Sequence, residues 1–158
     1  MFDRLILKEL DVWATKDNRK PLVIRGARQV GKTTVVNQFA SRFKQYIYLN
    51  LELIHDRQPF EQFNTIETLV QTLFFIKNLP LSKKDSTLIF IDEIQEVPEA
   101  LNILRYFYES EKGIAVIAAG SMLETLFDNN ISFPVGRVEY KVLRPVSFPE
   151  FLAAMGES

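Results

Sequence analysis

Cysteine is absent from this 158-residue sequence, and histidine occurs once, at His55. Without cysteine the chain can form neither disulfide bonds nor thiolate metal sites, and a lone histidine with no second His or Cys does not make a zinc site. The lack of cysteine also agrees with a reducing compartment. Disulfide-stabilised proteins are therefore excluded, and zinc-dependent proteins are disfavoured.

Long apolar runs are missing as well. No stretch approaches the roughly eighteen apolar residues that span a bilayer. The first residues, 1–5, contain an acid, and charge returns at Lys8 and Glu9, so the start does not read as a secretion signal. We therefore expect a cytoplasmic protein without a membrane partner. We also expect one domain over residues 1–158, because there is no repeat or low-complexity tract and the length suits a single core.

A glycine-rich motif is the most informative feature that is present. Residues 26–33 fit the pattern G-x-x-x-x-G-K-[ST] at every fixed position, directly after the apolar run 21–24. In such a loop the glycines let the backbone wrap a phosphate, and the next helix presents its positive end to the anion. We expect Lys32 to reach the β- and γ-phosphates and Thr33 to bind Mg²⁺. Arg28 is expected to face a neighbouring segment. The predicted nucleotide-binding residues are Gly26, Ala27, Arg28, Gln29, Val30, Gly31, Lys32, Thr33 and Thr34.

Charge is spread unevenly, although the net charge is only −1. Residues 1–50 hold ten Lys and Arg against four Asp and Glu, whereas residues 51–158 hold nine against sixteen. The basic part contains the glycine-rich motif, and a polyphosphate ligand explains part of the asymmetry. No dense basic stripe remains that would by itself indicate nucleic acid.

Segments of helical and strand character alternate along the chain. Apolar residues at helical spacing predict helices, and short β-rich apolar runs predict strands. Four successive apolar residues at 88–91 suit a strand covered on both faces, as in a parallel sheet. The alternation predicts an α/β fold, a three-layer α/β/α sandwich with a mainly parallel five-stranded sheet and ligands at the carboxyl ends of its strands. The predicted helices are 2–14, 32–43, 66–77, 98–111, 121–127 and one from 147 to a stop at 156; the strands are 22–25, 46–49, 88–91, 114–119 and 138–143; and 82–86 is a solvated loop.

Two carboxylates end the third predicted strand. An acidic residue after strand hydrophobics is where a phosphate-loop protein holds its Mg²⁺, usually through water, and Asp92 stands there. The next residue, Glu93, can polarise a water for attack on the γ-phosphate. Taken alone, the pair could be a solvated strand end. In sequence after the phosphate loop, it indicates a metal ligand and a catalytic base.

Two further residues are candidates with an alternative reading. Ser121 follows the fourth strand, where a polar side chain would lie beside the γ-phosphate, but it also fits a capping box for the next helix. Arg137 precedes the fifth strand and could neutralise transition-state charge as an arginine finger, or be an ordinary surface residue. The candidate catalytic residues are thus Glu93, Lys32, Ser121 and Arg137, and the candidate metal ligands are Thr33 and Asp92.

Six segments, in order, resemble the signatures of a prokaryotic AAA-type ATPase family. The resemblance spans nearly the whole chain, and it implies that Lys32 and Thr33 are loop ligands, Asp92 the metal carboxylate, Glu93 the catalytic carboxylate and Ser121 a sensor-like residue. It also implies ATP as the nucleotide. The segments are Arg25–Thr34, Asn50–Glu52, Ile89–Gln95, Ala119–Ser121, Gly136–Val138 and Pro145–Phe151.

Members of that family usually continue through a helical region into a C-terminal domain, sometimes suggested to be nuclease-like or DNA-associated. The resemblance therefore implies that residues 1–158 are an ATPase core that is short for the family. A DNA or protein partner would act through the missing part. AAA-type proteins commonly complete a site with a neighbour's arginine, so a homo-oligomer is a further expectation.

Four functions fit these features to different degrees. An ATP hydrolase, Mg²⁺-dependent and coupled to an attached domain or partner, leads. A nucleotide-binding switch with negligible turnover is the alternative, because a lid or groups from a second subunit are absent. A small-molecule kinase is disfavoured by Glu93 and the lack of an arginine-rich lid. A GTPase is weaker still, because no Asn-Lys-x-Asp element for guanine follows the phosphate loop.

Overall fold

A five-stranded parallel sheet forms the centre of the molecule, with the strand order β2-β3-β4-β1-β5. The computed structural model describes residues 4–26, 31–121 and 136–142. The predicted α/β fold class is confirmed, and the sheet is parallel throughout. Its strands are β1 (Leu22–Arg25), β2 (Gln45–Asn50), β3 (Thr87–Asp92), β4 (Ala115–Gly120) and β5 (Glu139–Val142).

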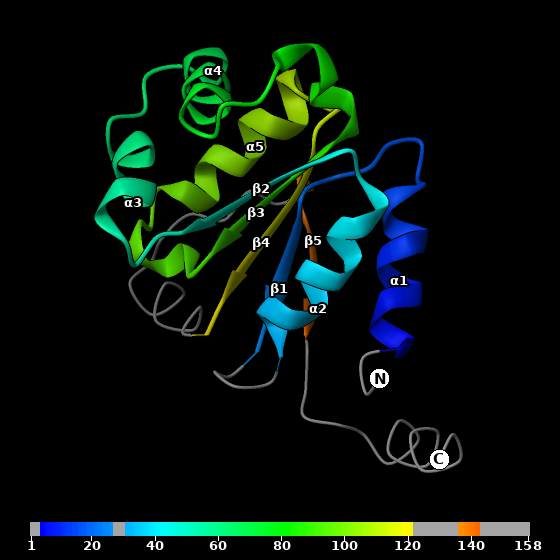
Figure 1. Cartoon of the computed structure of the whole chain (residues 1–158). Coiled ribbons are helices and arrows are strands. Elements are labelled where there is room, and N and C mark those ends of the chain that lie inside the picture. The colour runs from blue at the N-terminus through cyan, green and yellow to red at the C-terminus, as the bar shows by residue number, and fades with distance from the viewer. Residues whose placement is uncertain (1–3, 27–30, 122–135, 143–158) are drawn as a thin grey trace.

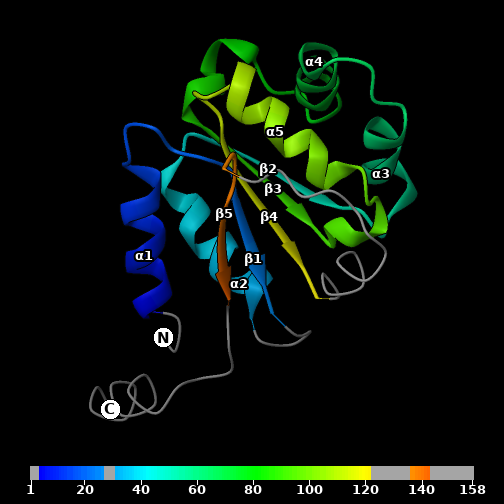
Figure 2. The ribbon, with the colours of Figure 1, turned by 180° about the vertical axis from the view of Figure 1, so that it is seen from behind.

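Helices cover both faces of the sheet, so the molecule has three layers (Figures 1 and 2). Within a strand, successive side chains point to opposite faces. Leu22 and Ile24 accordingly pack in the cluster with α1 and α2, while Val23 between them packs in the cluster with α3, α4 and α5. The helices are α1 (Arg4–Ala14), α2 (Lys32–Phe39), α3 (Ile54–Glu61), α4 (Ile66–Ile76) and α5 (Ala100–Ser110), with short 3₁₀ helices at Ala40–Arg42, Leu81–Ser86 and Ile94–Glu96.

The path of the chain from strand to strand explains why helices cover both faces of the sheet. From β1 the chain passes over two strand positions to β2, and it then returns through β3 to β4. Connections between parallel strands are right-handed, so helices of the outward and the return path lie on opposite faces. α2 therefore covers one face, and α3, α4 and α5 cover the other. Because the inner strands are covered on both sides, every residue of β3 and β4 is buried.

Helix α1 packs against α2, the helix that follows the glycine-rich loop. The Trp13 ring lies 6.3 Å from that of Phe39, centroid to centroid, and Trp13 Nε1 donates to the Lys20 carbonyl oxygen at 2.7 Å. Both aromatic side chains are almost fully buried. Tertiary packing of this kind, rather than intrinsic propensity, stabilises a helix as short as α2.

Several predicted elements differ from the structure. Helix α3 was not expected, the helix predicted over 32–43 ends at Phe39 and continues as a 3₁₀ turn, and the predicted loop 82–86 belongs to a 3₁₀ helix. The predicted helices 121–127 and 147–156 lie outside the described residues, apart from Ser121. In the described part of the chain, no helix has the length and apolar character needed to cross a membrane.

Candidate functional site

The residues singled out in the sequence meet at the carboxyl end of the sheet. β1 lies between β4 and β5, and the connections that leave β1 and β4 run in opposite directions. In open α/β sheets ligands bind where the strand order reverses in this way. Gly26 follows β1, Asp92 ends β3, and Ser121 follows β4, whose place is between the other two strands. Three segments that are far apart in the sequence therefore meet at the carboxyl end of the sheet.

The start of α2 is suited to an anion. Gly31 is the N-cap residue of the helix, with φ 90° and ψ 18°, and it has no side chain that could cap the first turn. Only glycine adopts this left-handed conformation without steric cost. In an α-helix the first-turn N–H groups, which here include those of Thr33 and Thr34, have no acceptor within the helix and can bind an anion. Residues Ala27, Arg28, Gln29 and Val30, predicted to complete the phosphate loop, lie outside the described residues.

Lys32 is buried at this helix start, with 7% of its surface exposed. Its Nζ donates to the carbonyl oxygen of Gly26 at 2.7 Å, so the side chain spans the two ends of the glycine-rich loop. A buried ammonium group is stable only when anions or carbonyl dipoles surround it. The lysine therefore lies next to Gly26, the residue at which the loop leaves β1.

Asp92 connects several groups of the site through hydrogen bonds, and 4% of its surface is exposed. Its Oδ2 accepts hydrogen bonds from Thr33 Oγ1 at 2.9 Å and from Tyr48 OH at 2.8 Å, and its Oδ1 accepts from the Glu93 N–H at 2.9 Å. The hydrogen bonds from these three donors offset the free-energy cost of burying the charged carboxylate. The bond between Asp92 and Thr33 joins the two predicted metal ligands, which are far apart in the sequence.

Glu93 is held in an unusual backbone conformation, with φ 52° and ψ 50°. For a residue with a Cβ, the left-handed region costs about 1–2 kcal/mol, and such strain often marks functional positions. The turn directs the side chain towards β4, where Oε1 accepts from Ser121 Oγ at 3.2 Å and from Gln95 Nε2 at 2.9 Å. The predicted catalytic carboxylate and the predicted sensor residue are thus in direct contact.

Tyr48 and Gln95 are site residues that the sequence reasoning gave no role. Gln95 lies in the segment Ile89–Gln95 that resembles the family, and Tyr48 lies in the predicted strand 46–49.

Burial and the nearby Asp92 charge raise the pKa of Tyr46 above its usual value. Burial, together with the hydrogen bond to Asp92, likewise raises the pKa of Tyr48. Both phenols therefore remain neutral hydrogen-bond donors at physiological pH.

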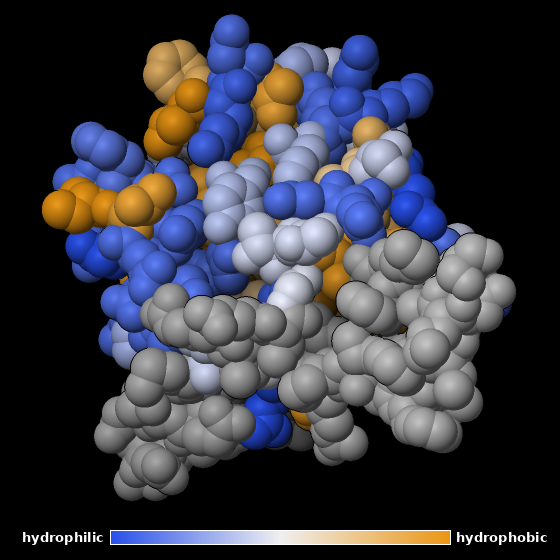
Figure 3. Space-filling view, turned by 60° about the horizontal axis from the view of Figure 1, so that its bottom comes forward, coloured by the Kyte–Doolittle hydropathy of each residue, from blue (hydrophilic) through white to orange (hydrophobic). Residues whose placement is uncertain are grey.

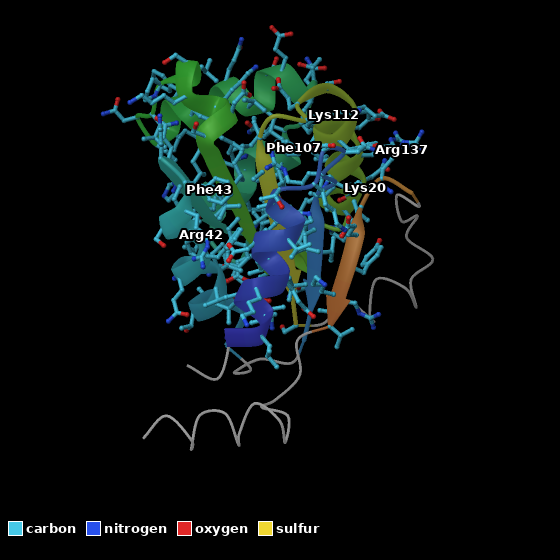
Figure 4. The ribbon with its side chains drawn as sticks, turned by 90° about the vertical axis from the view of Figure 1, so that its right-hand side faces the viewer. Lys20, Arg42, Phe43, Phe107, Lys112 and Arg137 are labelled. Atoms are coloured by element: carbon cyan, nitrogen blue, oxygen red, sulfur yellow. The ribbon has the colours of Figure 1, made fainter. Side chains whose placement is uncertain are left out.

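Arg137 lies at the opposite end of the sheet from the glycine-rich loop. Glu139 pairs with Leu22, so Arg137 is level with Lys20. Lys20 precedes Gly26 by six residues, which corresponds to about 20 Å along the strand. Figure 4 shows Arg137 near Lys20 and Lys112 at that end. Its Nε forms an exposed ion pair with Glu109 Oε2 at 2.9 Å. The structure therefore does not bring Arg137 together with the other site residues of its own chain.

With the carboxyl end of the sheet turned forward, the described surface is mainly hydrophilic (Figure 3). The hydrophobic side chains on this view form separate small patches.

Comparisons with known proteins agree with this geometry. A family model described as an AAA domain matches residues 18–152. The fold is similar to the Walker-type ATPase of Pyrococcus abyssi, with 18% identity, a TM-score of 0.61, and coverage of 99% of this chain and 57% of that one. It is also similar to the Drosophila ORC bound to DNA (13% identity, TM-score 0.60, 98% and 46% covered) and to the Aeropyrum pernix ORC1 protein in complex with DNA (14%, 0.55, 99% and 47%).

At these identities the similarity to the solved structures concerns the fold alone. The chain spans about half the length of those chains, from 46% to 57%. No protein with a curated function matches the sequence significantly.

Proposed function

The chain belongs to the AAA domain family of P-loop ATPases, and from that premise we propose that it binds Mg²⁺-ATP and hydrolyses it. The observation that carries the proposal is the bond between Thr33 Oγ1 and the buried Asp92 Oδ2, at the start of α2, where glycine is the N-cap residue. Lysine, hydroxyl and carboxylate then lie together at the carboxyl end of the sheet, where the strand order reverses. This set of groups matches the triphosphate and its cation.

The donor set fits a magnesium ion. Mg²⁺ takes oxygen ligands and is usually bound through one or two carboxylates together with substrate phosphates. Thr33 and Asp92 supply one hydroxyl and one carboxylate, already 2.9 Å apart. These two residues would hold the ion, which neutralises charge on the β- and γ-phosphates when bound.

Glu93 and Ser121 are proposed to serve the reaction itself. Glu93 would orient the attacking water and accept its proton as the bond from phosphorus to ADP breaks. Ser121 Oγ, at 3.2 Å from Glu93 Oε1, would keep the carboxylate aligned and lie next to the γ-phosphate. Lys32 would contact the β- and γ-phosphates.

A nucleotide-binding switch with negligible turnover is the second candidate function. Two observations favour it: the Glu93 carboxylate is held by Gln95 and Ser121, and Arg137 is too distant to reach the nucleotide of its own chain. In either case nucleotide state would be coupled to an attached domain or a partner. Two structures of similar fold are bound to DNA, so we propose DNA, or a protein reached through further domains, as that partner.

Thermal unfolding tests nucleotide binding directly. A ligand that binds only the folded state stabilises it by RT ln(1 + [L]/Kd), or about 2.7 kcal/mol at 100-fold excess over Kd. For a chain of this size the melting temperature should rise by about 5–10 °C. Mg²⁺-ATP should produce the shift, and ATP with EDTA should produce a smaller one. An unchanged melting curve at millimolar Mg²⁺-ATP would contradict the proposal.

Arg137 is proposed to act on the nucleotide of a neighbouring copy. If it does, specific activity should rise with protein concentration. Arg137→Ala should lower turnover by about 10³- to 10⁵-fold and leave ATP affinity nearly intact, because an arginine finger stabilises charge that develops in the transition state. Mixing Arg137→Ala with Glu93→Gln protein should restore part of the activity. Glu109→Gln, which removes only the ion-pair partner, is the matched control. No recovery in demonstrably mixed oligomers would exclude the role in trans.

A further inference from the structure

One oxygen of Asp92 is shared by two hydroxyl donors that come from different parts of the fold. Thr33 belongs to the first turn of α2, and Tyr48 belongs to β2, yet both donate to Oδ2, at 2.9 and 2.8 Å. The carboxylate is 4% exposed, so water cannot readily replace a donor that is lost. Among the residues that the structure describes, Thr33 and Tyr48 are the two side chains that donate to this oxygen.

The position of Tyr48 follows from the register of β2 and β3. Tyr48 pairs with Phe90, and Asn50 pairs with Asp92, so the phenol reaches diagonally along the same face to the carboxylate. The Tyr48 ring packs on the fully buried Phe90 ring, with centroids 5.5 Å apart and planes inclined by 53°. Packing therefore fixes the ring, and the hydroxyl has a defined direction.

We propose that Tyr48 is a positioning residue for Asp92, holding the carboxylate in place beside the Mg²⁺ of the bound nucleotide. The inference rests on the proposed function. The Thr33 hydroxyl donates its hydrogen to Asp92 in this structure, and its oxygen lone pairs would remain available to the ion in the loaded one. Tyr48 acts through Asp92 and touches neither ion nor nucleotide. Hydrogen-bond partners of metal ligands typically contribute about 10- to 100-fold to metal affinity.

Tyr46 provides a matched control. It lies two residues earlier on β2, on the same face, and is half-buried like Tyr48. Its hydroxyl donates to Asn37 Oδ1 at 2.6 Å. Tyr46→Phe and Tyr48→Phe thus remove the same atom from the same strand, but only the second removes a donor from Asp92.

The test measures binding of a fluorescent ATP analogue while Mg²⁺ is titrated. Tyr48→Phe should raise the half-saturating Mg²⁺ concentration by about 10- to 100-fold and leave the affinity measured in EDTA unchanged. Tyr46→Phe should change neither value. In an Asp92→Asn background, Tyr48→Phe should add no further shift, because its effect passes through the carboxylate. Melting temperatures without ligand check that each variant is folded.

The outcomes separate this inference from the proposed function. A Mg²⁺ requirement that is unchanged or lowered in Tyr48→Phe overturns the positioning role, and so does an equal shift in Tyr46→Phe, which would reflect general loosening of β2. A further shift in the Asp92→Asn background excludes action through Asp92. If the wild type binds no nucleotide at any Mg²⁺ concentration, the proposed function fails and this inference fails with it.

Discussion

Glu93→Gln is expected to reduce ATP turnover by about 10²- to 10⁴-fold, the usual contribution of a general base. ATP binding should persist, because the amide keeps an oxygen that can accept from Gln95 and Ser121 and so preserves the local contacts. Only the negative charge that orients and polarises the attacking water is lost. Phosphate release and equilibrium binding of ATP, measured on the same preparation, separate the two effects.

Glu96→Gln is the matched control for this experiment. Glu96 lies in the 3₁₀ turn that directly follows Glu93, and its side chain is exposed. The same charge is removed three residues away, so wild-type turnover is expected. A loss of much less than about tenfold in Glu93→Gln would reassign the base, since even weak general bases contribute about 10²-fold.

Lys32→Ala is expected to abolish the thermal shift produced by Mg²⁺-ATP. The ammonium group is buried at the start of α2, beside the loop that would hold the β- and γ-phosphates. Without it the phosphates lose their main positive partner from the loop. The rise of about 5–10 °C expected for the wild type should then disappear at the same ligand concentration.

Lys44→Ala removes a lysine that is exposed just before β2, at the other end of the sheet. It should retain the full shift. Lys32→Ala also removes the donor to the Gly26 carbonyl oxygen, so the melting temperature without ligand must be compared first. A folded Lys32→Ala protein that still shifts like the wild type would contradict the assigned role of the lysine.

Local sequence patterns were enough to predict the strands. The run 22–25 coincides with β1, and the predicted strands at 46–49, 88–91 and 114–119 differ from β2, β3 and β4 by one residue at most at either end. These segments are buried on one or both faces, so their apolar character is continuous and easily recognised. The family resemblance based on the motif residues is confirmed by the family match over residues 18–152.

Helix α3 could not be recognised in the same way. It is largely polar, buries only Phe60 and contains Pro59, which cannot donate a helical hydrogen bond. Its stability depends on tertiary contacts, which include the packing of Phe60 in the core and the bond from Arg57 Nη1 to the Leu51 carbonyl oxygen. A periodicity search detects neither of these features.

The register between neighbouring strands likewise could not be predicted from the sequence pattern. The position of Tyr48 beside Asp92 requires that Asn50 and Asp92 be level, and a shift by one residue would turn Tyr48 to the other face. The remoteness of Arg137 from the phosphate loop also follows from the pairing of Glu139 with Leu22. Both facts depend on how distant segments align, which no local run of residues encodes.

The position of β1 between β4 and β5 has a consequence for folding during synthesis of the chain. Leu22 pairs with Ile117 on one side and with Glu139 on the other, so the strand that carries the phosphate loop has no neighbour from the first half of the chain. Pairing of such distant segments is slow, because a long stretch of chain must first be closed. During synthesis on the ribosome, the loop sequence would emerge early and remain without its sheet partners. A nascent chain that ends before residue 115 would contain the glycine-rich loop, Tyr48 and Asp92, but it would lack β4, the strand that joins β1 to the pair of β2 and β3.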